Sequence, residues 1–186
     1  MLLLPTYPLE TERLRLRPFS RGDVEAVYAY RSREDVMHYM LDGPMSREAC
    51  AEAVQARVGQ MQWVGEGDKI LLVVERQGDG AMMGEVVLTL RHAEARQAEI
   101  GYVFHPDYHG HGYASEAAKA LMSLAFEAGV HRVYARCHAQ NRRSWRLMEG
   151  LGMRREAHFR QHALVRGAWD EELVYAMLED EWQARR

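Results

Sequence analysis

The sequence has few cysteines and little net charge, and both shortages exclude classes of protein. Its only two cysteines, Cys50 and Cys137, do not have the spacing of a metal site, and we expect both thiols to be reduced. The formal net charge of −3 gives no electrostatic reason to expect nucleic acid as a partner.

Long apolar runs are also missing. No stretch approaches the roughly twenty apolar residues that a membrane-spanning helix needs. The apolar residues 1–5 are too few for the hydrophobic part of a signal peptide, and no basic segment precedes them. We therefore expect a soluble, cytoplasmic protein without a membrane partner.

The chain is long enough for one sizeable core and short for two. Of its 186 residues, 47% are hydrophobic and 27% are charged, which is ordinary for a globular protein. No repeat, low-complexity segment or linker divides the sequence. We expect a single domain over residues 1–186, with its core at about 8–182.

Hydrophobic alternation and turn residues predict a mixed α+β fold. Leucine and arginine alternate over 13–17 as in a half-buried strand, and Ser20 with Asp23 indicates a capping box for a helix through Tyr30. Ser46 is expected to cap a second helix. The other expected elements are strands at 70–75 and 83–90 joined by a turn at 77–80, strands at 98–104 and 130–138, a helix at 144–151, and strands at 154–159 and 173–178 joined by a turn at 166–168.

The segment 108–117 is the most informative part of the chain. Gly110 and Gly112 open a long helix that runs to about Ala128, directly after a strand that Pro106 stops. Glycine lets a ligand approach the backbone closely, and the first N–H groups of a helix, at the positive end of its dipole, attract anions. This stretch predicts a phosphate-binding turn.

Two familiar phosphate-binding devices do not fit this turn. A dinucleotide fold needs a third glycine where Ser115 stands, and a P-loop needs a lysine that is absent here. A third pattern, Gln/Arg-x-x-Gly-x-Gly/Ala, fits better. His109-x-x-Gly112-x-Ala114 matches it at two of its three fixed positions.

That third pattern is the signature of the GNAT N-acyltransferases, and the resemblance covers nearly the whole chain. The motifs occur in the order of the family's RimJ/RimL-type branch: residues 10–18, Gly84-Glu85-Val86, residues 98–102, Asn141-x-x-Ser144 and residues 149–153. The resemblance implies a mixed, mostly antiparallel twisted sheet flanked by helices, with two central strands that splay apart.

It also implies where coenzyme A binds. Backbone groups at Val103 and Phe104 would contact the pantetheine arm and the thioester carbonyl, and the amide of Asn141 would reach the same arm, although plain N-capping also explains an asparagine there. The diphosphate would lie on the glycine turn, formed by His109, Gly110, His111, Gly112, Tyr113, Ala114 and Ser115.

Histidines gather around this turn, but we expect no metal. His105, His109 and His111 with Asp107 have spacings that could bring imidazoles together, yet His109 occupies the Gln/Arg position and His111 lies on an exposed turn. Because imidazole titrates near neutrality, histidine at this position raises the question of pH-dependent diphosphate binding.

The leaving thiolate of an acyl-CoA needs a proton. Many members of the family supply it from a tyrosine seven positions after the asparagine, but here that position is Met148, and a thioether cannot donate a proton. By resemblance to the RimL-like pattern, Ser144 is the candidate acid. The alternative is a serine with no role beyond its short helix.

Glu99 is the best candidate base. It lies on the central strand a few residues before the end that would contact coenzyme A, and burial could tune a carboxylate to neutral pH. The alternative is a structural carboxylate paired with an arginine. His138 and Glu85 are weaker candidates.

The sequence therefore predicts an N-acyltransferase with acetyl-CoA as its donor, using direct attack in a ternary complex. The acceptor would be a primary amine: a protein N-terminus, or a small amine such as an amino acid, a polyamine or an antibiotic. Two alternatives stay open, a catalytically silent acyl-CoA-binding module and an enzyme with a longer donor such as succinyl-CoA. Either the acceptor pocket or the core is expected to hold the aromatic and methionine residues of the N-terminal third, Tyr28, Tyr30, Met37, Tyr39, Met40, Met45 and Trp63. A homodimer is possible but has no marker in the sequence.

Overall fold

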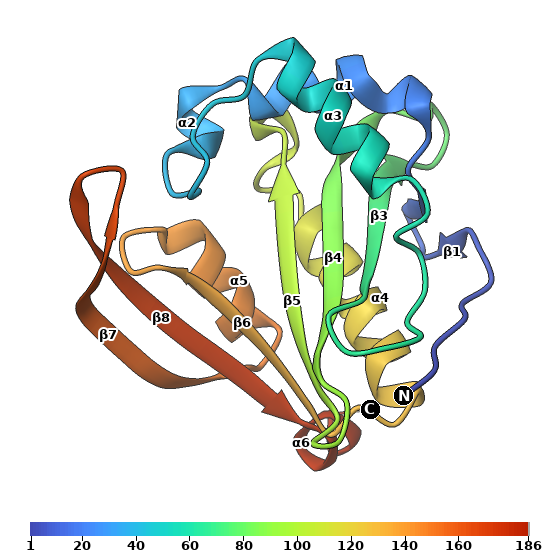
Figure 1. Ribbon diagram of the computed structural model, residues 1–186. Coiled ribbons are helices and arrows are strands. Elements are labelled where there is room, and N and C mark those ends of the chain that lie inside the picture. Colours follow the sequence, from blue (N-terminus) through green and yellow to red (C-terminus); the bar gives the residue numbers. More distant parts are fainter. Residues whose placement is uncertain (186) are drawn as a thin grey trace.

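A computed structural model describes residues 1–185; Arg186, the last residue of the expected domain, lies outside them. The described strands form one eight-stranded sheet in the order β1-β2-β3-β4-β5-β6-β8-β7 (Figure 1). All neighbouring strands are antiparallel except β5 and β6. The strands are β1 (Leu9–Glu10), β2 (Leu14–Pro18), β3 (Lys69–Arg76), β4 (Met82–His92), β5 (Gln97–Phe104), β6 (Arg132–His138), β7 (Arg154–Val165) and β8 (Ala168–Leu178).

The predicted α+β fold class is confirmed, and every expected element is present. The helices are α1 (Val24–Arg31), α2 (Glu34–Met37), α3 (Arg47–Arg57), α4 (Tyr113–Glu127), α5 (Arg142–Gly150) and α6 (Glu179–Gln183), with 3-10 turns at Arg21–Asp23 and Pro106–Tyr108. The sequence did not predict β1, α2 or α6. It also made the last hairpin too short, because β7 is largely exposed and lacks the clear alternation of a strand with one buried face.

Helices cover both faces of the central sheet. Helix α4 packs against β2, β4 and β5, while α1 and α3 lie on the opposite face, as Figure 1 shows. Strand β3 reads as a continuous apolar run because its side chains enter cores on both faces: Ile70 and Leu72 on the α4 side, Leu71 and Val73 on the α1 and α3 side.

The central strands β5 and β6 part from each other. They pair only at 97–99 with 132–134, although β5 continues to Phe104 and β6 to His138. Strand β5 stays paired with β4, and β6 stays paired with β8, so the sheet opens into two halves that diverge in Figure 1. The expected splayed strand pair is thus present.

Gly84 shapes this opening. A Cβ at this position on β4 would lie 2.8 Å from Cα of Phe104 and would also clash with the Val103 carbonyl. Real Cβ atoms essentially never make such contacts. The missing side chain therefore lets the far end of β5 lie against β4, on the side away from β6.

Candidate functional site

The glycine turn leads into α4 as the sequence predicted. Gly110 and Gly112 both have φ of +80°, a left-handed conformation that favours glycine, and Gly112 is the N-cap of α4. The backbone N–H groups of residues 110–115 donate to no acceptor within the part of the chain that the structure describes. The turn thus offers a set of free donors at the positive end of a helix dipole.

Arg13 holds this turn on β2. Its guanidinium donates to the His111 carbonyl at 2.9 Å, pairs with Glu116 at 2.6 Å, and lies over the Tyr113 ring at 4.7 Å. Burial alone would raise the pKa of Glu116, but hydrogen bonds from Thr11 and Arg13 keep that pKa below its usual value. The one carboxylate in the first turn of α4 is therefore neutralised by an arginine.

The ring of His109 lies between the end of β5 and α5. One nitrogen, Nε2, is 3.1 Å from the Phe104 carbonyl, and Nδ1 is 3.1 Å from the Arg143 guanidinium. Since arginine only donates, Nδ1 accepts and Nε2 carries the proton. Burial lowers the pKa of His109, which favours the neutral ring. Arg143, to which the sequence pattern assigned no role, is a permanent cation beside this ring, in addition to Arg13 at the turn.

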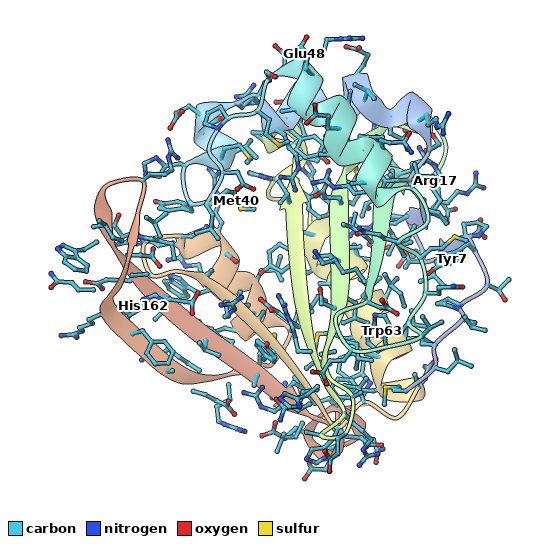
Figure 2. All side chains as sticks on the ribbon, viewed as in Figure 1. Tyr7, Arg17, Met40, Glu48, Trp63 and His162 are labelled. Atoms are coloured by element: carbon cyan, nitrogen blue, oxygen red, sulfur yellow. The ribbon has the colours of Figure 1, made fainter. Side chains whose placement is uncertain are left out.

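A cavity of about 220 Å³ lies in the opening between β5 and β6. The strands β4, β5 and β6, helices α1 and α5, and the loop after α2 contribute to its walls. Figure 2 shows Met40 reaching from that loop toward the opening. The lining residues are Arg31, Tyr39, Met40, Glu85, Val87, Ile100, Gly101, Tyr102, Val103, Arg136, Cys137, His138, Asn141, Ser144 and Met148.

Backbone alternation decides which amides of β5 face this cavity. The His105 N–H donates to the Met83 carbonyl at 2.8 Å, on the β4 side. Because successive N–H groups of a strand point in opposite directions, the Val103 N–H also points toward β4, and the N–H groups of Tyr102 and Phe104 point toward the opening. Of the two backbone positions that the resemblance indicates, Phe104 has its N–H directed toward the opening and Val103 does not, although Val103 lines the cavity.

Ser144 and Tyr102 meet at the α5 side of the cavity. The Tyr102 hydroxyl is 3.0 Å from Ser144 Oγ and 3.1 Å from the Ser144 carbonyl. Asn141 caps α5 by accepting the Ser144 N–H at 3.2 Å, so the structural reading of that asparagine is fulfilled, and Asn141 also lines the cavity. Sequence analysis assigned Tyr102 no role, because its partner is 42 residues away.

Two sulfur-containing side chains complete this end. Met148 is buried and lines the cavity where the family resemblance placed it, with no proton to give. Burial raises the pKa of the Cys137 thiol to about 11, so this thiol stays protonated near neutral pH.

Glu99 lies at the point where the strands part. Its carboxylate accepts from Arg91 of β4 at 2.6 Å and from Arg136 of β6 at 2.9 Å. These two ion pairs join the three strands at the last backbone pair of β5 and β6, Glu99 with Tyr134. Glu99 is not among the residues that line the cavity. This geometry agrees with the structural alternative, an ion-paired carboxylate.

The two weaker base candidates, Glu85 and His138, also have charged or hydrogen-bonding partners. Burial opposes ionisation of Glu85, but the charges of Arg31 and Arg57 keep its pKa below the usual value. His138 accepts the Gln140 N–H at Nδ1 and has Nε2 3.5 Å from Asp170, so its free lone pair is already engaged.

Within residues 1–185, no helix is both long and apolar enough to cross a membrane. In the same range, no three side chains among histidine, cysteine, aspartate and glutamate gather as ligands for a metal ion.

Comparison with known proteins agrees with the geometry. A family model described as "Acetyltransferase (GNAT) domain" matches residues 13–154. The relative named "Uncharacterized N-acetyltransferase YnaD", from Bacillus subtilis, is 35% identical over 175 residues, which make up 94% of this chain and 98% of that protein.

Solved structures give the same answer. A GNAT-family acetyltransferase from Bacillus anthracis superposes with a TM-score of 0.83 at 35% identity, covering 97% of this chain and all of that one. RimL, a ribosomal L7/L12 alpha-N-protein acetyltransferase solved with coenzyme A, shares the fold with a TM-score of 0.80 at 21% identity, over 94% of this chain and 98% of that chain. A matching family model, a parted β5–β6 pair and a free-amide glycine turn together establish that the chain belongs to the GNAT family of acetyltransferases, which includes RimL-type members.

Proposed function

We propose that this chain acts as one domain that transfers the acetyl group of acetyl-CoA to a primary amine, by direct attack in a ternary complex. One observation carries the proposal: β5 has amides without a β6 partner beyond residue 99, and the turn that follows it has N–H groups, at residues 110–115, without an acceptor among the described residues. That arrangement suits a long ligand with a diphosphate at one end and a thioester at the other.

In this proposal the diphosphate lies on the N–H groups of the glycine turn, with Arg143 nearby as a cation. The pantetheine arm follows β5, where the N–H groups of Tyr102 and Phe104 are available, and passes Asn141. The RimL neighbour, solved with coenzyme A, supports this donor class.

The reaction needs only one proton donor. The neutral amine attacks the thioester carbonyl, the carbon–sulfur bond breaks, and the thiolate takes a proton as coenzyme A leaves; the amide nitrogen loses its extra proton to water. We assign the donated proton to Ser144 Oγ, which takes a proton back from solvent as coenzyme A leaves, and we assign Tyr102 the role of fixing that hydroxyl at 3.0 Å.

We assign Glu99 to the strand junction rather than to proton removal, because Arg91 and Arg136 both hold its carboxylate. Without a dedicated base, the acceptor's own pKa governs the pH profile. An α-amine, with a pKa of about 8, would then react at lower pH than a lysine-like amine with a pKa of about 10.

The residue at position 148 also fits a second function. Met148 occupies the position of the usual proton donor and lies in the cavity wall, as it would in an acyl-CoA-binding module that lacks catalysis. A longer donor such as succinyl-CoA is the other alternative, and the experiment below separates all three.

The test measures free thiol released from acetyl-CoA or succinyl-CoA in the presence of amines, with the product checked by mass spectrometry. Turnover with acetyl-CoA and an amine, absent without the amine, supports the proposal. Tight binding of coenzyme A without turnover on any amine would favour the silent module, and faster turnover with succinyl-CoA would correct the donor.

A further inference from the structure

The cavity ends, on the α1 side, at a buried cluster of charges. The Glu85 carboxylate forms ion pairs with Arg31 and, at 3.0 Å, with Arg57, and it accepts the Tyr30 hydroxyl at 2.7 Å. Arg31 is 6% exposed and Glu85 5% exposed. Tyr30, Arg31 and Glu85 are thus buried, and Arg57, with 13% of its side chain exposed, lies at the edge of the cluster.

The charges in this cluster do not balance. Each guanidinium is permanently positive and the carboxylate is negative. Burial raises the pKa of the Tyr30 hydroxyl well above its ordinary value, so this group stays neutral. One positive charge is therefore left over, in a place where an uncompensated charge is costly.

Arg31 also has an unsatisfied donor. Its Nε is buried and has no hydrogen-bond partner among the described residues. Buried polar side-chain atoms nearly always have a partner, so an orphaned donor on an arginine calls for an explanation. A second anion at this end of the cavity would supply both the missing charge and a hydrogen-bond acceptor after a small shift of the side chain.

The cavity gives such an anion access to Arg31 and not to Arg57. Arg31 and Glu85 line the same cavity as Ser144, whereas Arg57 does not. The charged groups on the β6 wall have their own partners: Arg136 pairs with Glu99 and with Glu172, and His138 lies beside Asp170. The excess positive charge is thus local to the α1 end.

We infer that Arg31 binds a carboxylate of the acceptor, so that the substrates are amines that carry a carboxylate group and not polyamines. This inference rests on the proposed function, since it assumes that the acceptor enters the cavity. The carboxylate could belong to a free amino acid or to an acidic side chain near the N-terminus of a peptide, and both sources offer the same chemistry to the guanidinium.

Matched acceptor pairs test the inference. Leucine is compared with isopentylamine and phenylalanine with phenethylamine, which differ only in the carboxylate; Ala-Glu-amide is compared with Ala-Gln-amide, and spermidine is added. We expect the carboxylate-bearing member of at least one pair to have a kcat/KM at least tenfold higher, and the pair that responds identifies the source.

Three substitutions locate the effect. Arg31→Gln should abolish the preference within a pair, chiefly through KM for the carboxylated acceptor, while the affinity for coenzyme A stays within twofold. Arg57→Gln is the comparison variant: it removes the same positive charge but leaves the Arg31 donors in the cavity lining, so it should weaken the preference without abolishing it. Arg31→Lys, which keeps the charge, should retain part of it and guards against a folding defect.

The outcomes are separable. Equal turnover of both members of every pair, a preference for spermidine, or a preference that survives Arg31→Gln would overturn the inference while leaving the acetyltransferase intact. Absence of both coenzyme A binding and turnover would instead refute the proposed function, and this inference with it.

Discussion

Replacing Gly112 by aspartate puts a carboxylate where we propose that the diphosphate binds. Gly112 has φ of +80°, which costs a residue with a side chain about 1 to 2 kcal/mol. Gly112→Ala carries the same backbone cost without the charge. The comparison of alanine with aspartate therefore isolates electrostatics at this position.

The aspartate variant should remain folded. A Cβ at residue 112 would lie 3.4 Å from Arg13 Nη2, which is ordinary contact, and aspartate is a favoured N-cap residue. The carboxylate of the aspartate would itself accept hydrogen bonds from the free N–H groups of the turn. The diphosphate would lose binding free energy in two ways: the attraction of the helix terminus, about 1 to 2 kcal/mol, would be cancelled, and the two negative groups would repel each other by a similar amount. A total of about 2 to 4 kcal/mol corresponds to a roughly 30- to 1000-fold weaker Kd.

Isothermal titration with coenzyme A measures this directly. We expect the aspartate variant to bind roughly 30- to 1000-fold more weakly than the alanine variant, with a smaller gap at high salt because part of the effect is screened. Pantetheine, which has no phosphate, should bind both variants alike. Equal affinity of the two variants for coenzyme A would refute the assignment of the glycine turn to the diphosphate.

Three further predictions concern the other end of the cavity and its supports. Ser144→Ala should lower kcat about 10²- to 10⁴-fold with little change in KM for acetyl-CoA, and Tyr102→Phe should lower kcat about tenfold. If Ser144→Ala releases thiol at a rate within twofold of the wild type, Ser144 is not the acid. Glu99→Gln should lower the free energy of unfolding by about 1 kcal/mol in chemical denaturation, because two half-exposed arginines lose their charged partner. Loss of the acidic limb of the kcat/KM profile in this variant would instead make Glu99 the base. Burial lowers the pKa of His109 in the folded state, so the contribution of this residue to stability is present above its ordinary pKa near 6.5 and is lost as the pH falls through the lowered value. The wild type should therefore lose more unfolding free energy than His109→Gln between pH 8 and pH 5.5. Parallel plots of unfolding free energy against pH would contradict the neutral ring.

Local signals were enough to predict the elements and the turn. The glycine turn before α4, the stop at Pro106 and the capping box at Ser20 each depend on neighbouring residues, and all three lie where the sequence placed them. The helix α5 begins at Arg142, two residues before the expected start, because Asn141 caps it. Boundaries of this kind are set by single hydrogen bonds.

The contents of the cavity depend on contacts between distant residues, which periodicity does not report. Tyr102 meets Ser144 across 42 residues, and Arg31 meets Glu85 across 54. The sequence marked Glu99 as a candidate base from its place on the strand, but the two arginines that hold it come from β6 and the end of β4. Residue type and position identified the candidates; only the pairing of side chains separated a chemical role from a structural one.

The most direct test of the central claim is a crystal structure of the protein with coenzyme A. The account predicts the diphosphate within hydrogen-bond distance of the N–H groups of residues 110–115, the pantetheine arm in the opening between β5 and β6, and the thiol close to Ser144 and Tyr102. Coenzyme A bound outside that opening, or a diphosphate with no contact to the glycine turn, would contradict it.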